Sequence, residues 1–187
     1  MTFVKTISLE EAEGKTKEIY DDIIQRRGQL SEVLCSTSLN PESVVKHLDL
    51  YMTIMFGRSP LKRAQREMIA VIVSAGNDCE YCQTHHAIAL NYFWKDDARV
   101  EQLRMDYKAL RDLTAQEIMF CDYAYQLTKH PEKSTEKIIA QMKNIGIEDR
   151  AIVGATLVIS YFNFVNRIVI GLGVNLADDA GEGYKFD

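Results

Sequence analysis

Residues 67–86 read EMIAVIVSAGNDCEYCQTHH and set out two successive helices separated by a short turn. The first half is apolar, whereas residues 74–78 are turn-forming and helix-capping types. The first helix is therefore predicted to end there and the second to begin near Cys79. With Asn77 as the N-cap, Glu80 falls at the third helical position and completes an approximate capping box. The two halves can then pack as a helical hairpin.

The second helix carries a Cys-x-x-Cys pair, Cys79 and Cys82, followed four residues later by His86. Spacings of three and four residues place these side chains on one helix face, so His86 can serve Cys82 directly. Free amides and the macrodipole at a helix start stabilise thiolates, so both sulfurs are expected to ionise more readily than free cysteine. On the preceding helix, Glu67 either orients His86 across the hairpin or is a solvated partner of Arg63. This constellation suits thiol redox chemistry.

A zinc site is an alternative use of the cysteine pair. The pair and either adjacent histidine offer three ligands, but Cys35 and Cys121 are isolated in apolar surroundings and provide no second ligand pair. We therefore expect no metal and no other cofactor, with Cys35 and Cys121 in the core. His85 lies about 100° around the helix from His86, which favours a rim or surface position.

The rest of the chain also divides into helices bounded by caps and breakers. No alternating run of β-branched residues lies between turn signals, and no βαβ pattern supports a thioredoxin-like fold. The sequence predicts an all-α fold in a single domain, residues 1–187, with a core at about 41–175 and a tail at 177–187. In the first half of the chain, helices are expected from a capping box at 8–11 to Gly28, as a short helix starting at Ser31, from Asn40-Pro41 to Gly57, and from Ser59-Pro60 to Ser74. In the second half, helices are expected from Asp96 or Asp97 to near Arg111, from a capping box at 114–117 to before Pro131, from Ser134 to Gly146, and over 151–171.

Charge and length argue against several function classes. The 187 residues carry 22 basic and 27 acidic side chains, a net charge of -5, which disfavours nucleic acid as a partner. The first five residues are too short and too polar for a signal peptide, so we expect a cytoplasmic protein whose cysteines can cycle. Segment 151–171 is long enough to span a membrane, but Asn163, Asn166 and Arg167 make that costly. We expect this helix in the core or in a subunit interface.

The site residues also match a known pattern. Glu-x11-Cys-x-Tyr-Cys-x3-His, formed by Glu67, Cys79, Tyr81, Cys82 and His86, resembles the active-site signature of the AhpD-like alkylhydroperoxidases of the carboxymuconolactone decarboxylase superfamily. Further segments look like the branch of uncharacterised peroxidase-related proteins in that superfamily, namely 40–42, 66–70, 74–82 and 163–167.

The resemblance implies an all-α, AhpD-like domain that forms obligate homo-oligomers, as trimers or hexamers. It also implies roles: Cys82 attacks a hydroperoxide, Cys79 closes a disulfide with it, and His86 and Glu67 move protons. Tyr81 lines the site by resemblance alone, since helical spacing turns it away from the Cys79 face.

The function implied is a thiol-dependent peroxidase that reduces hydrogen peroxide or alkyl hydroperoxides. Its partner is an external dithiol of lipoyl or thioredoxin type, with neither nucleic acid nor membrane involved. Two alternatives stay open. One is a dithiol–disulfide oxidoreductase or redox-sensing module, and the other is a decarboxylase-like enzyme that uses only His86 and Glu67 as acid and base.

Overall fold

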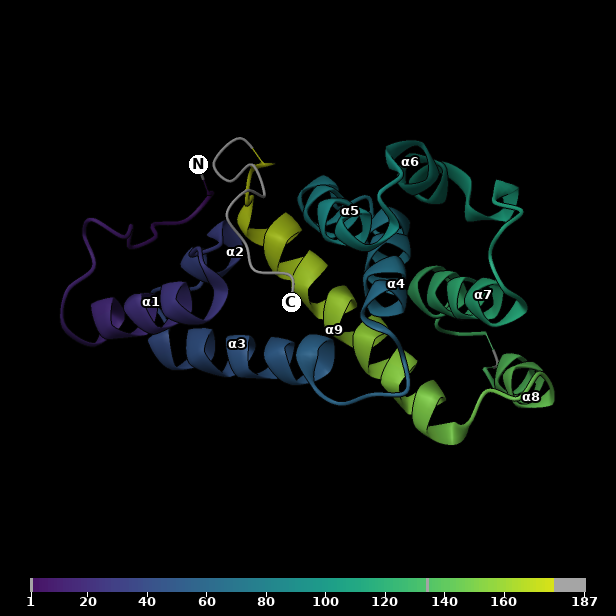
Figure 1. Cartoon of the computed structure of the whole chain (residues 1–187). Helices are drawn as coiled ribbons and strands as arrows, with labels where there is room; N and C mark the ends of the chain where they lie inside the picture. Colours follow the sequence, from purple (N-terminus) through teal and green to yellow (C-terminus); the bar gives the residue numbers. More distant parts are fainter. Residues whose placement is uncertain (1, 134, 177–187) are drawn as a thin grey trace.

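The computed structural model describes residues 2–133 and 135–176 (Figure 1). No strand occurs in these ranges, which confirms the predicted all-α fold. The elements are α1 (Gly14–Arg27), α2 (Glu32–Cys35), α3 (Pro41–Phe56), α4 (Arg63–Gly76), α5 (Glu80–Trp94), α6 (Asp97–Asp106), a 3-10 turn η1 (Tyr107–Ala109), α7 (Ala115–Lys129), α8 (Glu136–Asn144) and α9 (Asp149–Leu172).

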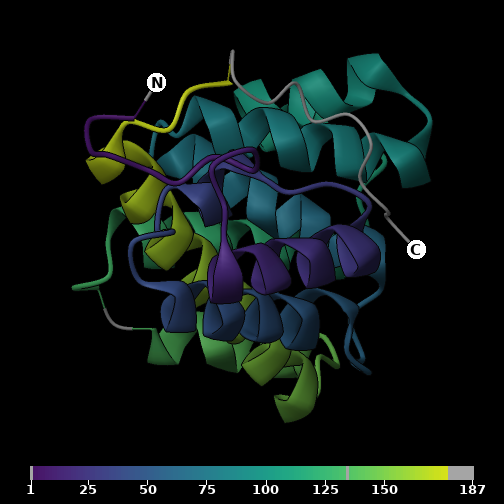
Figure 2. The same ribbon diagram turned by 90° about the vertical axis from the view of Figure 1, so that its left-hand side faces the viewer.

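The long helix α9 runs between two groups of helices (Figure 1). On one side, α2 and α3 contact it, and α1 packs on α3. On the other side, α4, α5, α7 and α8 contact it. Figure 2 shows α1 and α3 lying side by side in front of the rest of the molecule. Residues of α9 can therefore meet side chains from both groups.

By length and composition alone, α9 could cross a membrane, since its most apolar window has a mean hydropathy of 1.5. Half of that window is buried inside the protein. A central helix of a packed domain shows the same apolar composition, because it is covered on several sides. The observed packing of α9 agrees with the predicted core position.

The core consists of two clusters of buried apolar side chains. The larger one is built mainly from α4, α5, α7 and α9, and the smaller one lies among α1, α2 and α3. Val33 and Tyr51 pack against both clusters. The junction between the two clusters is where the N-terminal helices face α5 and α9.

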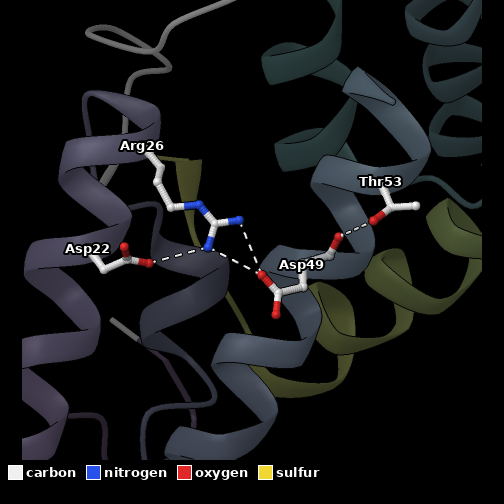
Figure 3. A network of polar contacts seen from close by, with 4 residues as sticks. All are labelled: Asp22, Arg26, Asp49 and Thr53. Carbon is white, nitrogen blue, oxygen red and sulfur yellow. Dashed lines mark hydrogen bonds and ion pairs between the residues drawn. The ribbon is translucent and has the colours of Figure 1, made fainter. Parts of the chain in front are cut away.

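A polar network fixes α1 against α3 (Figure 3). Arg26 donates hydrogen bonds to Asp22, one turn earlier in α1, and to Asp49 in α3, at 3.3 and 3.2 Å. The Thr53 hydroxyl donates to the carbonyl of Asp49 at 2.8 Å. Partly exposed ion pairs of this kind add little net stability. They join α1 to α3, and the next residue of α1, Arg27, is buried with an exposed fraction of 4%.

Most predicted helix starts are confirmed, with caps at Thr114 and Asp96 that accept the expected backbone hydrogen bonds. The predicted start at Ser8 is wrong. Ser8 and Glu11 do form reciprocal hydrogen bonds, both 3.2 Å long. However, Gly14 has a φ of +50°, a left-handed conformation that glycine tolerates, and α1 begins only at this residue.

Two other predictions need comment. The helix after Asp96 ends at Asp106 and continues only as η1, so it stops short of the predicted end near Arg111. The predicted cap Ser134 and the predicted tail at 177–187 lie outside the described residues.

Candidate active site

The turn between α4 and α5 places the cysteine pair. Asn77 follows the last residue of α4, Asp78 takes a left-handed conformation with φ 54°, and Cys79 is the N-cap of α5. The prediction that Asn77 caps α5 and that Glu80 sits at its third position is therefore wrong. Because Asp78 adopts the left-handed conformation, the N-cap of α5 is Cys79, two residues after the predicted Asn77. Glu80 is therefore the first helical residue and Cys82 the third.

The Asn77 side chain is used in a different contact. Its amide donates to the side-chain oxygens of Asn163 and Asn166 on α9, at 3.1 and 2.9 Å. Asn166 is fully buried and donates in turn to the Ser74 hydroxyl at 3.2 Å. Buried polar groups of this kind fix geometry when all of them are satisfied. This asparagine network ties the turn before Cys79 to the central helix.

The two cysteines form a buried dithiol rather than a disulfide, with exposed fractions of 1% and 2%. A hydrogen bond from the Cys82 thiol lowers the pKa of Cys79, assisted by the backbone N–H of Cys82 and by the Asn166 side chain. The same hydrogen bond, together with burial and the charge on Cys79, raises the pKa of Cys82 well above its usual value. The prediction that both sulfurs are acidic thus holds for Cys79 only, because two adjacent negative charges repel each other.

The helical hairpin brings Glu67 to His86. The Nδ1 atom of His86 lies 2.6 Å from Oε2 of Glu67, and Nη2 of Arg63 lies 2.6 Å from Oε1. Burial alone raises the pKa of Glu67, but the charges of His86 and Arg63 outweigh it, so its pKa lies below the usual value. Glu67 is fully buried, so its interpretation as a solvated partner of Arg63 is wrong. It pairs with both residues at once.

The hydrogen bond to Glu67 sets the state of the imidazole. A carboxylate that accepts from Nδ1 favours the tautomer with a free Nε2, and it stabilises the imidazolium when the ring is protonated. His86 lines the cavity described next, whereas Glu67 does not. No hydrogen bond joins His86 to Cys82 within the described ranges, where Cys82 bonds to Cys79 and Asn166 instead.

A cavity of about 100 Å³ lies at the junction of the two core clusters. Of the cysteine pair, Cys82 lines it and Cys79 does not. Both groups of helices contribute walls: α5 provides Tyr81, His85 and His86, α9 provides Tyr161 and Phe162, and the N-terminal helices provide Arg27, His47 and Tyr51. Such a lining, largely apolar with a few polar groups, is typical of small-molecule sites.

Two residues of α5 differ from what helical spacing predicts. Tyr81 is buried against the cavity, in keeping with the resemblance and not with its expected direction. His85 lines the cavity as well, so its predicted rim position is only partly right. The two rings stack with centroids 4.1 Å apart, and the Tyr81 carbonyl lies 2.8 Å from His85 Nδ1. The hydrogen bond orients the His85 ring, and the Tyr81 ring stacks against it.

Arg27 brings a positive charge to the cavity wall. Its guanidinium lies 4.5 Å from the centre of the Phe56 ring and 5.3 Å from that of Tyr51. Cation–π contacts of this kind are strongest where water is excluded. Nothing in the sequence around Arg27 marked it as a site residue, because it reaches the cavity only through the packing of α1 on α3.

The other cysteines are structural, as predicted. Cys35 and Cys121 are buried in the two core clusters, and burial raises the pKa of Cys121. Within residues 2–133 and 135–176, no three His, Cys, Asp or Glu side chains gather closely enough to hold a metal ion.

His47 makes protein stability depend on pH. It is buried, bonds through Nε2 to the Tyr161 hydroxyl at 2.8 Å, and burial lowers its pKa from 6.5 to about 4. As the pH falls from 6.5 toward 4, the unfolded chain takes up this proton first. The stability present above pH 6.5 is therefore lost progressively, by about 3 kcal/mol.

Urea unfolding between pH 7 and pH 4 measures this loss. The His47→Asn variant is expected to show a shallower decline of unfolding free energy in this window. The matched control His130→Gln replaces a histidine whose side chain is 44% exposed, and it is expected to keep the decline. Equal declines in all three proteins would contradict the assignment to His47.

Comparison with known proteins places this geometry among related folds. The profile of the carboxymuconolactone decarboxylase family matches residues 43–104. An uncharacterized peroxidase-related protein from Silicibacter sp. TM1040 is 28% identical, with a TM-score of 0.79 over 92% of this chain and 93% of that chain. No curated protein sequence matches the chain.

Two further solved structures share the fold at lower identity. One is an alkylhydroperoxidase AhpD core protein, an uncharacterized peroxidase-related protein from Ralstonia eutropha JMP134, at 19% identity and a TM-score of 0.82 over 93% of this chain and 91% of that chain. The other is the debrominase Bmp8, solved as a cysteine-to-alanine variant in complex with 2,3,4-tribromopyrrole. It is 16% identical, with a TM-score of 0.79 over 97% of this chain and 96% of that chain.

Proposed function

We propose that this chain, which belongs to the AhpD-like proteins of the carboxymuconolactone decarboxylase superfamily, is a thiol-dependent peroxidase that reduces hydrogen peroxide or alkyl hydroperoxides. One observation carries the proposal. Cys82, hydrogen-bonded to Cys79, lines a small apolar cavity together with His86, whose imidazole is bound to the buried carboxylate of Glu67. A nucleophile, a second thiol and a positioned acid thus meet where a small substrate fits.

The first step oxidises Cys82. Cys79, whose pKa is lowered, enters this step as the thiolate. It takes the Cys82 proton along the hydrogen bond between the sulfurs, and the resulting Cys82 thiolate attacks the terminal oxygen of the peroxide. The O–O bond breaks, Cys82 becomes a sulfenic acid, and the imidazolium of His86 gives a proton to the departing alkoxide. Helical spacing alone favours His86 as the direct acceptor of the Cys82 proton. The hydrogen bonds of Cys82 favour Cys79 as the first acceptor instead.

The second step closes the disulfide. The Cys79 thiol attacks the sulfenic sulfur, and its proton leaves with the hydroxyl group as water. An external dithiol of lipoyl or thioredoxin type then restores both thiols by exchange. This cycle requires neither nucleic acid nor membrane as a partner, and a cytoplasmic location would keep the dithiol reduced between turnovers.

We also propose that the protein works as a homo-oligomer, a trimer or a hexamer. Val153, Leu157 and Phe164 are each about half exposed on α9. Large apolar side chains repeated along one exposed helix are typical of surfaces that associate. Sedimentation of the purified protein at several concentrations tests this part of the proposal.

Mass spectrometry tests the redox cycle directly. After one equivalent of hydroperoxide, the reduced protein is expected to lose two hydrogens, and digestion should yield a peptide cross-linked between Cys79 and Cys82. A protein that consumes peroxide without forming this cross-link contradicts the proposal. A cross-link formed no faster than a free dithiol reacts would instead favour the dithiol oxidoreductase or redox sensor.

Two other reactions can be separated from peroxide reduction. Reductive dehalogenation of a small aromatic ring is suggested by the debrominase of the same fold and by the aromatic cavity walls. The cavity of about 100 Å³ is smaller than one of about 150 Å³ that admits a single benzene, which favours a smaller substrate. Bromide release from 2,3,4-tribromopyrrole in the presence of a dithiol tests this reaction. Decarboxylase-like chemistry would instead survive replacement of both cysteines.

A further inference from the structure

We propose that the disulfide is reduced through a second opening, in which the thiolate of an external dithiol attacks Cys79 while the cavity remains the entrance for peroxide. This inference rests on the proposed redox function of the cysteine pair. Oxidation by peroxide then takes place at Cys82 from the cavity, and reduction by the dithiol takes place at Cys79 from the second opening.

The second opening is a hollow of about 330 Å³ between the start of α5 and the end of α9. Among the described residues, its lining includes Cys79 but not Cys82, whereas the cavity includes Cys82 but not Cys79. Tyr81 lines both spaces and therefore forms part of the wall between them. The two cysteines thus line different spaces on either side of one tyrosine.

Disulfide exchange requires access to the sulfur under attack. A thiolate attacks along the axis of the S–S bond, from the side away from the leaving sulfur. Of the pair, Cys79 is the cysteine that lines the hollow, and attack on its sulfur breaks the disulfide and releases Cys82 as a thiolate. The Asn166 side chain bonds to Cys82 and stabilises that charge. The product is a mixed disulfide between Cys79 and the carrier.

The second thiol of the carrier completes the exchange. It gives its proton to the Cys82 thiolate, whose pKa is raised, and attacks the carrier sulfur of the mixed disulfide, so that the oxidised carrier leaves and Cys79 is released. Thiols with a lowered pKa are better leaving groups, and the pKa of Cys79 is lowered by the hydrogen bond from Cys82. Two electrons pass from the carrier to the protein, and the carrier becomes a disulfide.

The walls of the hollow select a carrier. Ile170, Val174 and the ring of Phe3 provide apolar surface, while Asp78 and Glu80 are exposed and acidic. No basic side chain contributes to the lining in the part of the chain that the structure describes. A dithiol on an apolar, uncharged arm fits this surface, and an anionic carrier is disfavoured by charge repulsion.

Thiol labelling tests access to each sulfur without any peroxide. Besides Cys35 and Cys121, the Cys82→Ser protein keeps Cys79 and the Cys79→Ser protein keeps Cys82, and mass spectrometry of the digested protein assigns the label to its cysteine. Each is treated with methyl methanethiosulfonate, which is small, and with 4,4′-dithiodipyridine, which is bulky and neutral. The ratio of the two rates cancels differences in thiol acidity. We expect the bulky reagent to be disfavoured at least about tenfold more at Cys82 than at Cys79. Equal ratios, or the reverse order, would overturn the proposal.

Reduction kinetics test the hollow itself. The disulfide is formed with diamide, so the result does not depend on peroxidase activity, and dihydrolipoamide is the reductant. Ile170→Trp is expected to slow reduction at least about tenfold by filling the hollow. Leu50→Trp is the matched control, because Leu50 is 46% exposed on α3, against 51% for Ile170, and lies outside the hollow. Unchanged reduction of the Ile170→Trp protein would contradict the proposal.

A charge comparison sharpens the test. Dihydrolipoamide and dihydrolipoate carry the same dithiol and the same alkyl arm, and they differ by one negative charge. We expect the amide to reduce the disulfide several-fold faster at low ionic strength, with a smaller difference in salt and in the Asp78→Asn/Glu80→Gln protein. Equal rates for both reductants at low salt would show that the acidic rim does not face the carrier.

Discussion

Replacing Cys82 with serine is expected to abolish peroxide turnover, with a fall in kcat/KM of at least about a thousandfold. A hydroxyl group is a far weaker nucleophile than a thiolate and cannot form the sulfenic acid on which the cycle depends. The introduced hydroxyl would still accept a hydrogen bond from Asn166, so the fold should be retained. The rate of hydroperoxide loss with an excess of dithiothreitol measures the effect.

The Cys79→Ser protein is the matched control. It also loses turnover, because no second thiol closes the disulfide, but Cys82 should still react once with peroxide. Dimedone is then expected to label the Cys79→Ser protein after peroxide treatment and to leave the Cys82→Ser protein unlabelled. The opposite pattern would make Cys79 the attacking sulfur, and the cavity would then not be the peroxide site.

The features predicted best from sequence are those set by neighbouring residues. Capping residues located most helix starts, and the i, i+4 spacing placed Cys82 and His86 beside the same cavity, whereas Cys79 lies at the N-cap and outside that cavity. The pairing of Glu67 with His86 was also anticipated, although nothing in their separation along the chain fixes the angle between two helices. The fully buried Glu67 shows why the surface alternative failed: its charge is balanced by Arg63 and His86 from opposite sides.

Single-residue backbone conformations were not predictable in the same way. Asn77 is a common N-cap, so its position before an apolar helix suggested a cap. In the structure Asp78 adopts the left-handed conformation, which aspartate tolerates better than most residues, and the helix start moves to Cys79. A similar competition at Gly14 separates the Ser8 capping box from α1. In both cases the sequence was compatible with two positions for the helix start, and the packing of the folded chain selected the later one.

The cavity walls were missed for a different reason. Arg27, His47 and Tyr161 come from three helices that are far apart in sequence, and each follows ordinary core spacing in its own helix. A buried aromatic side chain that lines a cavity has the same pattern as one that fills a core. Asn166 gave a weak signal, since a fully buried asparagine in an apolar helix needs polar partners. Those partners proved to be the cysteine pair and the turn before it.

Replacing Glu67 with glutamine is expected to lower kcat/KM for hydroperoxide by about 10² to 10⁴, with little change in side-chain volume. An amide cannot stabilise the imidazolium of His86, and its NH₂ group can donate to Nδ1 and so shift the ring to the wrong tautomer. The same change leaves the buried guanidinium of Arg63 without its carboxylate, so a loss of stability of a few kcal/mol is expected as well. Peroxide kinetics and urea unfolding measure the two effects separately.

Arg63→Gln distinguishes chemistry from folding. Arg63 contacts the Oε1 side of Glu67, and its guanidinium stacks 3.9 Å from the centre of the Phe56 ring, so its removal costs stability. The hydrogen bond between Glu67 and His86 uses Oε2 and remains possible in this variant. We therefore expect Arg63→Gln to match Glu67→Gln in stability loss while keeping most of the peroxide activity. If both variants lost activity in proportion to stability, Glu67 would be a structural residue, and His86 would need another group to hold its proton.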